Sequence, residues 1–137
     1  MSRLRYLLDT TMLSDLLKNP TGSVAGHIAK VGEDCICTSI VAAAELRYGA
    51  AQSQSKTIGD RVDLILSAIE VLPLELPADH HYAHIRHHLT RRGTPIGPND
   101  LLIAAHALAE TLTVVTANTS EFESVPGLAL ENWLNTD

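Results

Sequence analysis

The sequence has few of the residues that mark disulfide-rich or zinc-binding proteins. Only 2 of its 137 residues are cysteines, and aromatic residues make up only 4%. Cys35 and Cys37 are two positions apart, where a disulfide has poor geometry, and a structural zinc ion normally takes four ligands. We interpret them as two small buried hydrophobic residues.

Long apolar runs are also missing. The apolar run that follows Arg3 and Arg5 is ended by Asp9, too early for a signal peptide, and segments such as 101–105 are too short to cross a bilayer. We therefore expect a cytoplasmic protein with no membrane partner.

Positive charge is in the minority. The chain has 10 Lys and Arg residues against 16 Asp and Glu residues, a formal net charge of −6 at pH 7. This balance argues against a broad surface for nucleic acid, because a polyanion is held mainly by cations. It still allows a local basic rim around an acidic centre.

The sequence does contain a regular alternation of strand and helix patterns, with 45% hydrophobic residues to form a core. The predicted strands cover residues 6–8, 35–38, 71–74, 112–115 and 128–130. The predicted helices cover residues 10–17, 22–31, 40–52, 56–70, 77–92 and 100–110, with a short turn or helix at 120–122. The strands are apolar throughout, which is typical of a parallel sheet covered on both faces.

We therefore predict a single α/β domain over residues 1–137, with a central, mostly parallel sheet of about four to five strands flanked by helices. In such sheets, ligands bind beyond the carboxyl ends of the strands.

Three acidic residues occupy positions where chemistry is expected, and each has a structural alternative. Asp9 directly follows the first strand and is either a functional acid or a cap, although Thr10 and Thr11 can also cap the next helix. Glu45 lies on an apolar helix face, as a functional acid or as a partner of a nearby arginine. Asp100 starts a helix after a Gly-Pro loop, where it or Asn99 would also serve as the N-cap.

Two further polar residues follow the fourth strand. Asn118 and Glu121 lie just past its end, whereas Glu123 is expected to face solvent. Carboxylates that gather in one cleft raise one another's pKa unless a cation binds. Oxygen ligands favour Mg²⁺ or Mn²⁺, which lowers the pKa of a bound water and neutralises charge on a phosphoryl group. The expected reaction class is metal-assisted phosphodiester hydrolysis.

Four segments together resemble the PIN-domain ribonucleases, and in particular the VapC toxins of type II toxin–antitoxin systems. They are YLLDTT (6–11), AELRYGA (44–50), GTPIGPNDLLIAAHAL (93–108) and VTANTSEF (115–122), followed by VPGL (125–128) and ENW (131–133). The segments occur in the family's order and span the chain. A single short match would be weak, but four in sequence are specific.

The resemblance implies an endoribonuclease that depends on Mg²⁺, with Mn²⁺ as a possible substitute. Asp9 and Asp100 would bind the metal, and Glu45 would complete the site directly or through water. Thr11 matches a position that supports the first acid. Many family members have Asp at the position of Asn118, so we expect Glu121 to be the fourth acid and Asn118 to position it by a hydrogen bond.

The resemblance also implies partners. RNA, with tRNA first, would be the substrate, and cleavage would inhibit translation until a VapB-like antitoxin inserts a segment into the acidic cleft. A homodimer is expected, assembled further with antitoxin dimers on operator DNA.

The remaining candidates are basic. His80, His81, His84, His87 and His88 form a cluster on one helix, which we interpret as a solvated face rather than a Zn²⁺ or Ni²⁺ site. Arg86, Arg91 and Arg92 on that helix, together with Arg47, are candidate contacts to RNA.

Two other functions remain open. The first is a catalytically weak PIN fold that binds RNA or protein, which the neutral Asn118 keeps in play. The second is a small-molecule phosphatase, but Thr11 stands where the haloacid-dehalogenase pattern has its second Asp.

Overall fold

Five short strands form one parallel sheet, as predicted. The structure, a computed structural model, describes residues 3–134. The sheet order is β3-β2-β1-β4-β5, and all four neighbouring pairs are parallel. The strands are β1 (Tyr6–Leu8), β2 (Ile36–Ser39), β3 (Glu70–Leu72), β4 (Thr113–Val115) and β5 (Leu130–Glu131). In the centre of the sheet, Leu8 lies opposite Thr38 on one side and Val115 on the other.

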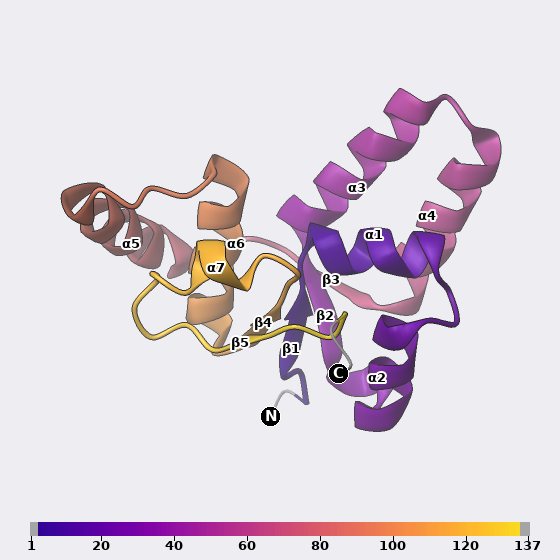
Figure 1. Ribbon diagram of the computed structural model, residues 1–137, viewed down its shortest axis with the longest axis horizontal. Helices are drawn as coiled ribbons and strands as arrows, with labels where there is room; N and C mark the ends of the chain where they lie inside the picture. Colours follow the sequence, from indigo (N-terminus) through magenta and orange to yellow (C-terminus); the bar gives the residue numbers. More distant parts are fainter. Residues whose placement is uncertain (1–2, 135–137) are drawn as a thin grey trace.

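Within residues 3–134, seven α-helices surround this sheet (Figure 1). They are α1 (Thr10–Lys18), α2 (Ser23–Val31), α3 (Ile40–Ser53), α4 (Lys56–Ala68), α5 (Ala78–Arg92), α6 (Pro98–Glu110) and α7 (Thr119–Phe122), with one 3₁₀ turn, η1 (Glu33–Cys35). The α3–α4 hairpin projects from one side of the molecule, and α5 packs against α6 on the other. The expected α/β class is thus confirmed.

The core has a large and a small part. The large part surrounds β1, in which Leu7 and Leu8 are both fully buried because helices cover both faces of the sheet. Trp133 belongs to it, with its ring 5.0 Å from that of Tyr6. The small part lies between α5, α6 and α7 and includes Phe122.

Some boundaries differ from the prediction. The helical pattern over 56–70 was predicted too long, because α4 ends at Ala68 and Glu70 opens β3. β3 in turn ends before Pro73 instead of continuing to residue 74, and proline has no N–H to donate to a sheet. The last strand lies at Leu130–Glu131 rather than at 128–130.

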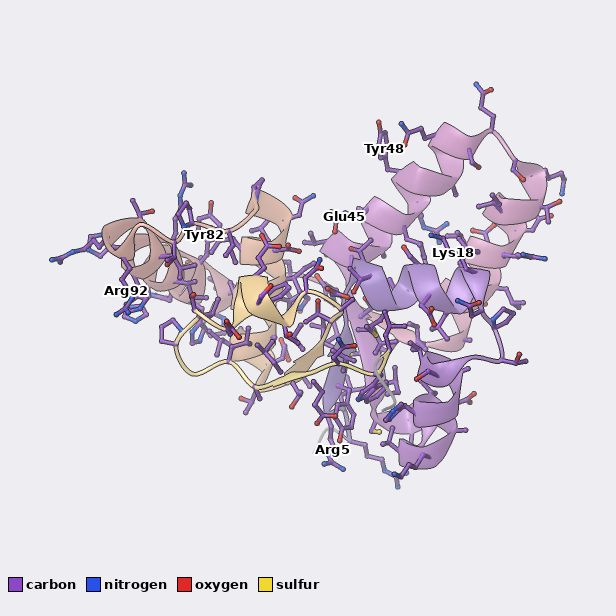
Figure 2. All side chains as sticks on the ribbon, viewed as in Figure 1. Arg5, Lys18, Glu45, Tyr48, Tyr82 and Arg92 are labelled. Carbon is purple, nitrogen blue, oxygen red and sulfur yellow. The ribbon has the colours of Figure 1, made fainter. Side chains whose placement is uncertain are left out.

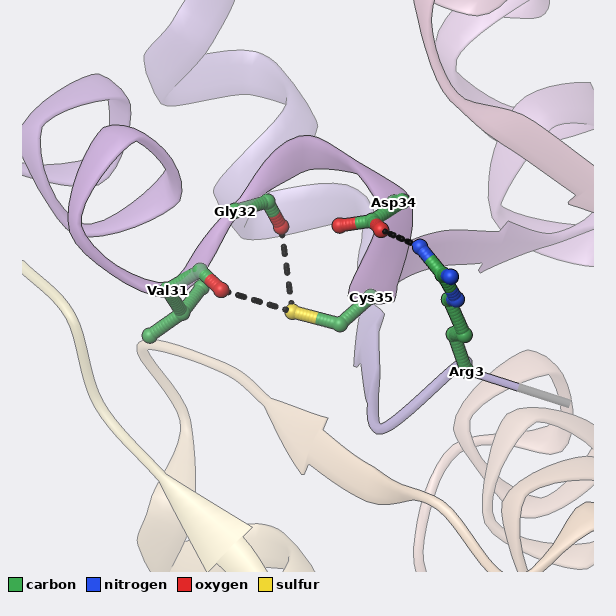
Figure 3. Close-up of polar contacts among 5 residues, drawn as sticks. All are labelled: Arg3, Val31, Gly32, Asp34 and Cys35. Atoms are coloured by element: carbon green, nitrogen blue, oxygen red, sulfur yellow. Dashed lines mark hydrogen bonds and ion pairs between the residues drawn. The ribbon is translucent and has the colours of Figure 1, made fainter.

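Both cysteines are free and buried, as the sequence indicated. Figure 3 shows the Cys35 thiol donating to the backbone oxygens of Gly32 (3.0 Å) and Val31 (3.4 Å). Beside it, Arg3 and Asp34 form an exposed ion pair at 2.8 Å. Burial raises the pKa of the Cys37 thiol to about 12, so this group stays protonated and is not a nucleophile.

Within residues 3–134, no helix has both the length and the apolar character required to cross a membrane.

Candidate active site

The strand order determines where polar groups gather. β2 and β3 are added on one side of β1, whereas β4 and β5 are added on the other side. The strand order therefore changes direction at β1, next to β4. In parallel α/β sheets, the crevice beyond the carboxyl ends at such a switch point is the usual ligand site. Asp9 follows β1 there, and Thr116 follows β4.

Asp9 is both an N-cap and a buried carboxylate, so the two alternatives for it are compatible. Only 2% of it is exposed, and its Oδ1 accepts hydrogen bonds from Met12 N (3.2 Å) and Thr11 Oγ1 (2.5 Å). Burial raises the pKa of Asp9, and hydrogen bonds, including one from Thr116, partly oppose this. The predicted capping by Thr10 or Thr11 was wrong, because Asp9 caps α1.

Thr11 connects this carboxylate to the other central strand. Its hydroxyl donates to Asp9 and accepts from Ala117 N at 2.9 Å. It thereby joins the start of α1 to the segment after β4. This geometry supports the role expected for Thr11.

Glu45 is half-buried on α3 and is held at both oxygens. Thr10 Oγ1 donates a short hydrogen bond to Oε1, and Asn99 Nδ2 donates to Oε2 at 3.1 Å. Its neighbour Arg47 instead pairs with Asp63 on α4 at 2.7 Å. Within residues 3–134, the alternative of a Glu45–arginine ion pair is therefore not realised.

Asp100 and Glu121 form the second half of the site. α6 begins at Pro98, with Gly97 as the N-cap, so neither Asn99 nor Asp100 caps it as the sequence allowed. Glu121 Oε1 accepts from Gly97 N at 2.9 Å. A Cβ on Gly97 would lie 3.6 Å from this oxygen and 3.9 Å from Asp100 Oδ2, so both carboxylates closely approach the same backbone position.

The electrostatics of Asp100 bring all four acids together. Its pKa is raised to about 7, first by burial, next by a side-chain hydrogen bond and charge repulsion with Glu121, and then by the charges of Asp9 and Glu45. Residues far apart in the sequence therefore share one electrostatic environment, as the sequence predicted.

The other candidates lie outside this group. Asn118 is exposed, and within residues 3–134 its side chain makes no hydrogen bond, although its backbone N donates to Thr116 Oγ1. Glu123 faces solvent, as expected. Figure 2 shows Arg92 on α5 and Glu45 on α3, with α6 between them. Arg86 donates to the hydroxyl of Tyr82 on its own helix at 2.9 Å.

The histidine cluster on α5 faces mainly outward. His80, His84 and His87 are exposed, whereas His81 and His88 are half-buried. Within residues 3–134, no three His, Cys, Asp or Glu side chains are already arranged to enclose a metal ion. The exposure of His80, His84 and His87 agrees with the expected solvated face.

Sequence reasoning overlooked the residues that hold Glu45. Thr10 and Asn99 are each adjacent in sequence to a predicted acid, Asp9 and Asp100 respectively. This adjacency was the available signal, but only the fold shows that both side chains converge on α3.

The acidic group fits a hard divalent cation. Its donors are carboxylate oxygens. The pKa of Asp100 is raised first by burial and then by neighbouring negative charge, and a cation would neutralise that charge. Mg²⁺ retains several waters and binds proteins through one or two carboxylates, so it does not require the closed cage that residues 3–134 lack. Carboxylates at the carboxyl edge of a parallel α/β sheet are an arrangement that metal-assisted phosphodiesterases use.

Comparisons with known proteins identify the family. The PIN domain model matches residues 6–128. Ribonuclease VapC2 of Rickettsia felis is 35% identical over 130 residues, covering 93% of this chain and 97% of that protein. The tRNA(fMet)-specific endonuclease VapC of Shigella flexneri is 39% identical over 131 residues, covering 95% and 98%.

Solved structures agree. A crystal structure of VapBC2 from Rickettsia felis, bound to a DNA fragment from their promoter, superposes with a TM-score of 0.89 and 33% identity over 95% of this chain and 99% of that one. The chain belongs to the PIN domain family. The expectation of a VapC-type PIN-domain nuclease is confirmed.

Proposed function

We propose that this chain is a divalent-metal-dependent endoribonuclease whose catalytic acids are Asp9, Glu45, Asp100 and Glu121. The observation that carries the proposal is geometric: Glu121 accepts from Gly97 N beside Asp100, and Asn99, the neighbour of Asp100, donates to Glu45. The charges of Glu121, Asp9 and Glu45 add to burial in raising the pKa of Asp100. The names of the VapC relatives support the nuclease class.

Each acid has a distinct environment and therefore a distinct proposed role. Asp9 and Asp100 bind the ion, Mg²⁺ first and Mn²⁺ as a substitute, which when bound lowers the pKa of a coordinated water and neutralises charge at the phosphate. Glu45 completes the site directly or through water, oriented by Thr10. Glu121 is the fourth acid, held in place by the backbone N–H of Gly97.

The supporting residues act by orientation. Thr11 fixes the Asp9 carboxylate, so its role is to prevent rotation when charge in the site changes. Asn118 has an exposed side chain that makes no hydrogen bond within residues 3–134, so the expected positioning contact is not formed. Arg86, Arg91 and Arg92 on α5 are proposed contacts to RNA phosphates at a distance from the acids, and Arg47 is retained as a fourth such candidate.

The proposed substrate is RNA, with tRNA first, because one relative is named a tRNA(fMet)-specific endonuclease. The proposed partner is a VapB-like antitoxin, since similar chains occur in VapBC complexes bound to DNA. We further propose that residues 1–137 act as one PIN domain in the cytoplasm, form a homodimer, inhibit translation, and assemble with the antitoxin on operator DNA.

The decisive experiment uses purified protein, total tRNA and Mg²⁺. Discrete cleavage by the wild type should be lost in Asp9→Asn and Asp100→Asn and retained in the matched control Glu123→Gln, which changes an exposed acid. EDTA should abolish the cleavage, and Mn²⁺ should restore it. If the wild type binds tRNA but leaves it intact in every metal, the chain is a PIN-fold binding module and the nuclease proposal fails.

A further inference from the structure

One aromatic side chain remains exposed beside the acids. The chain has five aromatic residues, one Trp, three Tyr and one Phe. Tyr6, Phe122 and Trp133 are buried, and Tyr82 is half-buried and bonded to an arginine, whereas Tyr48 is 67% exposed. Tyr48 and the exposed Ile40 both line one surface hollow beside Glu45, and a tyrosine ring offers an apolar face with a polar end for contact with a ligand.

Tyr48 lines the same cavity as the residues that hold Glu45. This cavity has a volume of about 770 Å³, and its lining consists of Thr10, Ile40, Val41, Ala44, Glu45, Tyr48 and Asn99. One part of the lining is apolar, formed by Ile40, Val41 and Ala44. The other part carries the carboxylate and its hydrogen-bond donors.

Tyr48 and Glu45 lie on one face of α3. Tyr48 is three residues after Glu45, so the two side chains share a face at a rise of about 4.5 Å. Figure 2 shows Glu45 and Tyr48 on the side of α3 that faces away from α4.

We propose that Tyr48 is a substrate-binding residue that stacks on an unpaired nucleobase next to the phosphate cleaved at the acids. The inference rests on the proposed nuclease function and assigns the residue that binds the base beside the cut. A phosphate at Glu45 places the adjoining nucleoside in this cavity, where the ring and the apolar floor accept the flat face of any base.

Continuity with the acids favours RNA over a peptide as the occupant. The polar part of the lining belongs to Glu45, Thr10 and Asn99, so a ligand in the cavity also touches the metal-binding region. A nucleotide provides a phosphate for that region and an aromatic base for Tyr48. A protein partner that uses the same surface is an alternative outcome of the test.

The test first maps the cleaved bond in tRNA. A short synthetic RNA with this bond and 2-aminopurine beside it then serves as the probe. Tyr48→Leu removes the ring, Tyr48→Phe retains it, and Leu64→Ala changes another exposed apolar residue on α4 as the control. Cleavage is measured in all four proteins, and 2-aminopurine fluorescence is measured with each change placed in an inactive Asp100→Asn background.

Tyr48→Leu is expected to raise KM roughly 10-fold to 100-fold with kcat within about 3-fold, and to abolish the quenching of 2-aminopurine. Tyr48→Phe and Leu64→Ala should keep the wild-type KM and quenching. Pairing the probed nucleotide into a duplex should remove most of the difference in KM and in 2-aminopurine quenching between the wild type and Tyr48→Leu.

Unchanged KM and quenching in Tyr48→Leu would refute the stacking role while leaving the nuclease intact. The stacking role is also refuted if Tyr48→Leu weakens only the binding of the cognate antitoxin, because the surface would then belong to a protein partner. A wild-type protein that cleaves no RNA refutes both the inference and the proposed function.

Discussion

Replacing Asp100 by asparagine should abolish cleavage and yet stabilise the metal-free protein at alkaline pH. In the folded chain, the pKa of Asp100 is raised from 3.8 to about 7, mainly by burial and by Glu121. Folding at pH 8 therefore forces an ionised carboxylate into a site that disfavours it. An asparagine amide carries no charge and can still donate a hydrogen bond to Glu121.

The sign of the effect follows from proton linkage. Below pH 3.8, Asp100 is protonated in both states and the penalty is absent. The penalty grows as the pH rises from 3.8 to about 7, because only the unfolded chain is then ionised, and it is complete above pH 7. The shift corresponds to about 4 kcal/mol, and solvent screening of this half-buried group reduces it to about 1–2 kcal/mol. At pH 5, only about a third of this difference should appear.

Urea unfolding at pH 5 and pH 8 in EDTA measures this difference, with Glu123→Gln as the control at an exposed acid. Adding Mg²⁺ should stabilise the wild type and have much less effect on Asp100→Asn, because binding to the folded state alone shifts the unfolding equilibrium. If Asp100→Asn is less stable than the wild type at pH 8, the assignment of electrostatic strain to Asp100 is contradicted. The same holds if the change in its free energy of unfolding is equal at pH 5 and pH 8.

Four further outcomes are expected. Mg²⁺ affinity measured by calorimetry should increase from pH 6 to pH 8, because binding must displace the proton of Asp100; a flat profile would argue against it as a ligand. Thr11→Val should lower the free energy of unfolding by about 1–3 kcal/mol and weaken Mg²⁺ binding, with Thr11→Ser restoring both, since valine leaves Ala117 N unpaired. Trp133→Ala should cost about 3–5 kcal/mol of stability in urea titrations without changing Mg²⁺ affinity. The double variant Arg91→Ala, Arg92→Ala should weaken RNA binding and reduce its salt dependence; unchanged affinity would remove α5 from the RNA surface.

The alternation of patterns was sufficient to predict the fold. The run at 6–8 is apolar on both faces and ends at Asp9, as a central parallel strand does, and Leu7 and Leu8 are indeed fully buried. The ends of helices and strands were less predictable where the apolar residues fit both a helical and a strand periodicity. Residues 69–72 are Ile-Glu-Val-Leu. Ile69 continues the apolar stripe of the preceding helix, but the segment also alternates between apolar and polar residues as a strand does. It forms a strand because residues 70–72 pair with β2.

The acids were predictable because each stands out against an apolar background. Glu45 is the clearest case, as a carboxylate between buried Ala42, Ala43 and Leu46. The residues that orient Glu45 could not be predicted, because Thr10 and Asn99 have ordinary local explanations as capping residues. Their function depends on a helix 35 and 54 residues away, respectively, and this relation exists only in the folded chain.

The order of the strands also governs when a nuclease of this design becomes active during its own synthesis. Asp9 is made early, but its partners Asp100 and Glu121 are made late, and β4 must insert beside β1 before the four carboxylates meet. A ribosome must therefore have made residues 9 to 121 before the nascent chain can attack any RNA. The topology thereby delays the nuclease activity until the last of the four acids has been made.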